Sequence, residues 1–196
     1  MRLLAFLVAV FAAFSVWQHV RLRQNEQHLA LAATVVAGRE VGVSCPGFWK
    51  RLVEITPYGG WVRFDGHGQP GDETELAAMT CRRLERLWRD PPDFACLAAD
   101  ACGKEELRTA RAVVVLAHES WHLRGVRNEA ETQCYAVQTT EATARALGLD
   151  PEAARRVALW AAADHAGEYD WEYRDSKRCR PRGAWDLRPE TAAWPG

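Results

Sequence analysis

Hydrophobic and polar positions divide the chain into an apolar N-terminal run and a longer remainder with mostly helical periodicity. The run from Leu3 to Trp17 is largely apolar, and including Val20 brings it close to the length that spans a bilayer as a helix. No convincing cleavage site follows it. Residues 1–22 are therefore predicted to be a signal anchor or transmembrane helix, and a secreted protein released by signal cleavage is the alternative.

The helical pattern continues beyond the anchor and predicts that residues 23–44 form a helical stalk. Residues 45–196 are expected to form one domain, because a segment of this length can bury a single core. In this domain residues 48–55 form an apolar stretch compatible with either a helix or a strand. Residues 61–65 alternate as a strand does, and His67 in the glycine-rich turn that follows is interpreted as a loop residue.

Helical periodicity accounts for most of the remaining domain. The predicted helices cover residues 72–88, 104–124, 129–147 and 151–167. The first is expected to be capped by Asp72 or Thr74, and the last by Asp150. The predicted fold class is mostly α with a small β element (α+β), behind an N-terminal transmembrane helix.

Composition narrows the possible partners. The formal net charge is -1, so no basic excess is present to neutralise phosphates, and nucleic acid is excluded as a main partner. Serine-hydrolase and nucleotide-binding motifs are absent from the sequence. The expected partner that follows from the N-terminal helix is a membrane.

The six cysteines are even in number and lack the paired spacing of a four-cysteine zinc site. In an exported chain they are expected to form disulfides, and their presence favours an extracytoplasmic domain. Buried thiols in a cytosolic protein are the alternative. Sequence does not determine the pairing, and our predicted pairs are Cys96 with Cys102, Cys45 with Cys81 and Cys134 with Cys179.

The strongest chemical signal is His118-Glu119-Ser120-Trp121-His122. On a helix the two histidines lie at i and i+4, so both rings project from one face, as two ligands of one zinc ion require. Glu119 lies on a neighbouring part of the surface, where it can act as a base without ligating the metal. Three valines at residues 113–115 could also indicate a strand, but the flanking residues favour a helix.

A catalytic zinc site needs a third protein ligand and an open position. Gly125 can adopt positive φ and turn the chain back toward the metal. Asn128 has the character of an N-cap, with Glu131 closing a capping box, which leaves Glu129 facing the turn. Glu129 is therefore the predicted third ligand, with Glu131 and Asn128 as alternatives.

These motifs resemble those of the gluzincin metallopeptidases, in which a glutamate on the helix after HExxH binds zinc. The residues Glu129-Ala130-Glu131-Thr132-Gln133-Cys134-Tyr135-Ala136 are similar to the ExxA(D/N)xxA helix of several bacterial and membrane-bound members. Thr132 and Gln133 depart from that pattern, and the gap after His122 is short. The stretch also resembles a metzincin motif with Gly125 in place, but Asn128 stands where a third ligand is usual and no methionine follows.

The resemblance implies a minimal zincin-like domain, similar to uncharacterised exported bacterial members. The expected partner is a peptide or protein substrate, whose peptide bonds are hydrolysed with Zn²⁺ and with Glu119 as general base. The resemblance also implies that residues 61–65 form an edge strand beside the metal that pairs with extended substrate. His165, Tyr169 and Tyr173 are candidate transition-state stabilisers. Two alternatives remain open: a non-catalytic membrane-anchored binding or scaffold module with a structural or absent metal, and hydrolysis of a non-peptide amide.

Overall fold

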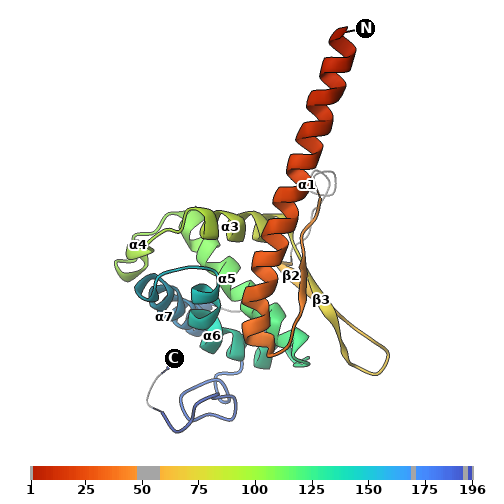
Figure 1. The fold of residues 1–196 in the computed structure, drawn as a ribbon. Helices are drawn as coiled ribbons and strands as arrows, with labels where there is room; N and C mark the ends of the chain where they lie inside the picture. The colour runs from red at the N-terminus through yellow and green to blue at the C-terminus, as the bar shows by residue number, and fades with distance from the viewer. Residues whose placement is uncertain (1, 48–57, 169–170, 192–193, 196) are drawn as a thin grey trace.

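The computed structural model describes residues 2–47, 58–168, 171–191 and 194–195. It confirms the predicted fold class, because helices dominate and one small sheet lies beside them (Figure 1). The predictions for residues 48–55 and for Tyr169 lie outside the described residues.

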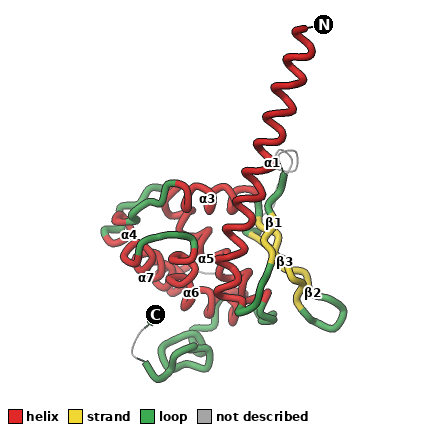
Figure 2. The backbone as a smooth tube through the Cα atoms, in the orientation of Figure 1, coloured by secondary structure: helices red, strands yellow, loops and turns green. Residues whose placement is uncertain are grey.

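Figure 2 shows how helices, strands and loops alternate along the chain. In chain order the elements are α1 (Arg2–Ala37), β1 (Gly42–Ser44), β2 (Gly60–Phe64), β3 (Pro70–Leu76), α3 (Ala78–Arg89), α4 (Ala95–Ala98), α5 (Lys104–Leu123), α6 (Glu129–Ala146), α7 (Pro151–Glu168) and the 3₁₀ helix η1 (Trp171–Tyr173).

Helix α1 has two halves with different surroundings. Its N-terminal half projects away from the rest of the chain and exposes apolar side chains from Leu3 to Val20 (Figure 1). By length and composition α1 could cross a membrane. Its C-terminal half places Leu29, Ala33 and Ala37 in the main hydrophobic core. Residues 23–44 thus include the predicted helix but do not form a separate stalk, because apolar side chains recur on the helix face that contacts the domain.

The sheet has the order β1-β3-β2, with β1 parallel and β2 antiparallel to β3. This arrangement corrects the prediction of one helix over residues 72–88, since the helix α3 begins only at Ala78. Thr74 and Leu76 are buried at alternate positions of β3, and the Thr74 hydroxyl donates to the Trp61 carbonyl, 3.1 Å away. Neither Asp72 nor Thr74 caps a helix, because both lie within β3, which pairs with β1 on one side and with β2 on the other.

Helices α5, α6 and α7 pack against one another beside the sheet, and α1 packs on α5 and α6. Their boundaries agree closely with the predicted ones. The Asn128 side chain accepts the Glu131 backbone N–H at 2.9 Å. The Asp150 carboxylate likewise accepts backbone N–H groups at the start of α7. These caps satisfy donors that a helix start leaves without partners, and they explain why the boundaries could be read from the sequence.

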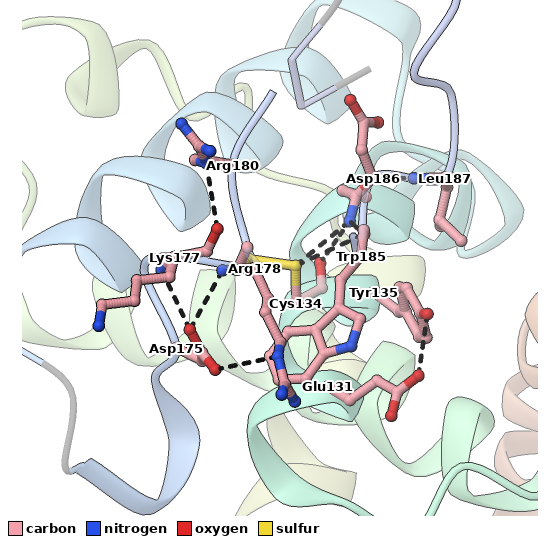
Figure 3. Close-up of a disulfide and its surroundings, with 12 residues drawn as sticks. Glu131, Cys134, Tyr135, Asp175, Lys177, Arg178, Arg180, Trp185, Asp186 and Leu187 are labelled. Carbon is pink, nitrogen blue, oxygen red and sulfur yellow. Dashed lines mark hydrogen bonds and ion pairs between the residues drawn. A yellow bond between two sulfur atoms is a disulfide. The ribbon is translucent and has the colours of Figure 1, made fainter. Parts of the chain in front are cut away.

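The six cysteines form the three predicted disulfides: Cys45–Cys81, Cys96–Cys102 and Cys134–Cys179. The last bond fastens the C-terminal tail to α6 (Figure 3). Trp185 of the tail is buried in the same contact, and its carbonyl accepts the Gln138 side-chain amide at 2.7 Å. The tail therefore belongs to the packed domain, although its sequence lacks periodicity.

Candidate metal centre

Three side chains from two helices converge on one point. His118 and His122 lie one turn apart near the end of α5, and Glu129 is the first residue of α6. One potential ligand atom from each of the three lies within 4.8 Å of the others. The same Glu129 oxygen is 3.0 Å from Nε2 of His118 and 3.4 Å from Nε2 of His122. The predicted ligand set is thus brought together in the structure.

A hydrogen bond at Nδ1 orients each of the two imidazole rings. Nδ1 of His118 is 2.9 Å from the Gln133 side-chain oxygen, and Nδ1 of His122 is 2.7 Å from the Val126 carbonyl. Both partners are acceptors, so Nδ1 of each ring carries the hydrogen and donates it. In the neutral imidazoles Nε2 is then left with its lone pair directed at Glu129. Such outer hydrogen bonds are typical of metal-binding histidines.

A turn at Gly125 produces this geometry. Gly125 has φ of 104°, a left-handed conformation that side chains disfavour, and its N–H donates to the His122 carbonyl at 2.9 Å. The chain leaves α5 here and re-enters a helix at Glu129, so that the Val126 carbonyl reaches back to His122. The predicted role of Gly125 as the bend before the third ligand agrees with this path.

The two alternative third ligands are engaged elsewhere. The Asn128 side chain caps α6, as described above. The Glu131 carboxylate accepts the Tyr135 hydroxyl at 2.9 Å. Neither residue belongs to the group of converging ligand atoms, which leaves Glu129 as the candidate that the geometry favours.

Glu119 is buried beside this group. Its Oε2 atom has no hydrogen-bond partner within the described part of the chain. Burial raises the pKa of its carboxyl, and the neighbouring His118 and His122 oppose that effect. Strand β2 lies against it, because a β-carbon added to Gly60 would be only 2.9 Å from Cγ of Glu119. A glycine at this position allows the strand to approach the carboxylate closely.

The electrostatics of the three converging groups suit a cation. In the imidazolium form Nε2 also carries a hydrogen, and hydrogen bonds from His118 and His122 then lower the pKa of Glu129 to about 2. Burial acts to lower the pKa of His122, but the hydrogen bond to Glu129 and the charge of Glu119 outweigh it and raise that pKa. The buried carboxylate of Glu119 and the half-buried carboxylate of Glu129 thus lie beside the same two histidines, where a divalent cation would offset their charge.

The group opens into a cleft of about 580 Å³. Its lining comes from β2 and the two residues before it, from α5, from the start of α6 and the turn before it, and from η1. The residues are Tyr58, Gly59, Gly60, Trp61, Val62, Phe64, Arg111, Val114, Val115, His118, Glu119, His122, Arg127, Glu129, Gln133 and Tyr173. Strand β2 is at the edge of the sheet, as the order β1-β3-β2 shows. The expected edge strand beside the candidate metal site is present.

The remaining candidates divide into one near the site and two away from it. Tyr173 lines the cleft, and its ring centroid is 5.9 Å from that of His118. His165 is buried on α7 and does not contribute to the cleft lining. His67 is exposed in the turn after β2, where the Asp65 carboxylate accepts its backbone N–H, which agrees with its interpretation as a loop residue.

Gln133 is the residue of this site that sequence reasoning missed. It lies four residues after Glu129 on α6, so both side chains point to the same side of that helix. That spacing was the available signal, but a glutamine one turn from a ligand is too common to single out.

Comparison of the chain with protein-family models, with curated proteins and with solved structures found no match.

Removing the outer hydrogen bond tests whether Gln133 supports a metal ligand. We expect Gln133→Ala to weaken Zn²⁺ binding by roughly 10- to 100-fold, because the His118 ring loses the acceptor that fixes its orientation. Calorimetric titration of the metal-free protein with Zn²⁺ would measure the change. Gln138→Ala is the matched control, since Gln138 is also buried on α6 but contacts Trp185. Equal affinities in the two variants would contradict the assignment.

Proposed function

We propose that this protein is a zinc-dependent metallopeptidase, with His118, His122 and Glu129 as metal ligands and Glu119 as general base. The observation that carries the proposal is the orientation of the two imidazoles. Both Nδ1 atoms are engaged by acceptors, so both Nε2 atoms converge with one Glu129 oxygen on a common point.

The donor set fits a catalytic zinc ion better than a structural one. Two nitrogens and one carboxylate oxygen are common ligands of catalytic zinc, which keeps one position open, whereas a structural site has four protein ligands. Among the described residues the converging group has three members and borders a cleft. This arrangement favours the catalytic alternative over a scaffold module with a closed metal site.

The chain supplies the groups that peptide hydrolysis needs. When bound, zinc would acidify a water and polarise the scissile carbonyl. Glu119 takes the proton of the attacking water and returns it to the leaving nitrogen. The outer edge of β2 pairs with an extended substrate and holds its carbonyl toward the ligands. Tyr173 lines the cleft, and we assign its hydroxyl the role of donating a hydrogen bond to the developing oxyanion.

We further propose that α1 anchors the domain in a membrane and that the domain is extracytoplasmic. The exposed apolar side chains of the first half of α1 and the three disulfides support this location. Helix α1 runs without a break from its exposed apolar half into the half that is packed in the core, which supports retention of the anchor over secretion.

A peptide library tests the activity. The purified, zinc-loaded full chain is incubated with mixed peptides, with and without a chelator, and products are identified by mass spectrometry. The proposal predicts cleavage that stops with chelator and returns when Zn²⁺ is restored. Stoichiometric zinc without cleavage of any peptide would favour the non-catalytic module or a non-peptide amide substrate instead.

A further inference from the structure

Helix α3 presents a row of exposed arginines: Arg82, Arg86 and Arg89, here called the arginine face. The three lie within one side of the helix, opposite the buried Leu84 and Leu87. Arg82 and Arg86 form no ion pair within the described part of the chain, whereas Arg89 contacts the Glu85 carboxylate at 3.1 Å. The cationic side of α3 is therefore only partly neutralised.

Contacts with α1 establish which way this face points. Arg82 borders a small hollow together with Gln18 and Arg21, which lie toward the N-terminus of α1. On another side of α3, Trp88 donates to the Asn25 side chain at 3.0 Å and stacks on His28. Because Asn25 and His28 lie further along α1, Arg82 is on the side of α3 that faces the projecting half of α1.

The position of α3 in the fold agrees with this orientation. In Figure 1, α3 lies at the end of the domain from which the apolar half of α1 emerges, and the C-terminal tail lies at the other end. The exposed apolar side chains run from Leu3 to Val20, and a helix of that length spans about 27 Å, close to the hydrocarbon thickness of a bilayer. Arg21, directly after it, would then lie at headgroup depth.

We propose that the arginine face binds anionic lipid headgroups of the leaflet that α1 enters, and so holds the domain against the membrane surface. Charge complementarity and continuity with the membrane helix identify the partner. Among the neighbouring carboxylates, Glu85 is buried and contacts Arg21 and Arg89, and Glu26 pairs with Arg23. The exposed Asp90 at the C-cap of α3 forms no ion pair with Arg82 or Arg86 among the described residues. The inference rests on the proposed membrane anchoring and is independent of peptidase activity.

Arginine footprinting of the unmodified full chain tests the proposal. The protein is reconstituted in lipid nanodiscs of phosphatidylglycerol or of phosphatidylcholine, and phenylglyoxal modification of each arginine is followed by mass spectrometry. We expect Arg82 and Arg86 to react about fivefold more slowly in the anionic discs, as the attraction of one cation to an anionic surface implies, and high salt to reverse the protection. Arg180 and Arg188 of the tail are the internal controls, because both are exposed and the tail lies at the end of the domain opposite the projecting half of α1 (Figure 1).

Two outcomes would overturn the proposal in different ways. If the chain floats with vesicles at high salt but Arg82 and Arg86 react equally in both lipids, or no more slowly than the tail arginines, the anchor holds and the arginine face does not bind lipid. If the chain does not float with vesicles, the proposed membrane anchoring is wrong, and the proposed lipid binding by the arginine face is wrong with it. Peptide hydrolysis, measured separately, decides the enzymatic proposal in either case.

Discussion

Replacing Glu119 by glutamine is expected to lower peptide turnover by roughly 10²- to 10⁴-fold and to leave the zinc content unchanged, because a general base contributes rate enhancement of that size. Glutamine has nearly the same shape as glutamate but cannot accept the proton of the attacking water. Glu119 lies outside the converging group of ligand atoms, so its replacement removes no ligand. Metal analysis and the initial rate of peptide cleavage on the same sample measure both effects.

The variant also separates catalysis from folding. Oε2 of Glu119 is buried with no hydrogen-bond partner in the described residues, so an uncharged amide should be tolerated there and the melting temperature should not fall. Glu131→Gln is the matched control, because Glu131 lies on the neighbouring helix, outside the converging group, and its carboxylate accepts a hydrogen bond from Tyr135. Undiminished hydrolysis by a zinc-replete Glu119→Gln protein would refute the assigned role.

The candidate metal ligands and the turn between them could be predicted, because their arrangement depends on local sequence. An i, i+4 pair of histidines shares a face of any α-helix, and a glycine after the helix permits a left-handed turn. Glu129 followed from the capping role of its neighbour Asn128. Gln133 and the Val126 carbonyl could not be predicted, because their contact with the histidines depends on how α6 packs against α5.

The errors in the fold have a similar origin. Leu76 and Met79 are three residues apart, a spacing that suits one face of an amphipathic helix. Residues 72–76 are nevertheless a strand, because they pair with β1 on one side and with β2 on the other. The apolar positions at Leu29 and Ala33 indicated a helix correctly, yet nothing local shows whether that helix stands alone or enters the core. Both questions are settled by tertiary contacts that the sequence pattern does not contain.

Replacing His118 by alanine is expected to abolish stoichiometric zinc binding, a larger loss than the roughly 10- to 100-fold change typical of an outer hydrogen-bond partner. The substitution removes one of three converging ligands and leaves the Gln133 oxygen without its donor. Two ligands then remain, and the cation no longer offsets the charges of Glu119 and Glu129. Calorimetric titration with Zn²⁺ measures the affinity directly.

Thermal unfolding provides an independent measure of the same loss. A ligand that binds only the folded state stabilises it by about 2.7 kcal/mol at 100 times its dissociation constant. Zinc should therefore raise the melting temperature of the natural protein and of Glu119→Gln, but not that of His118→Ala. His67→Ala, which changes an exposed turn residue, should keep the full shift. If zinc stabilises His118→Ala as strongly as the natural protein, the ion binds elsewhere and the arrangement on α5 and α6 is not the metal centre.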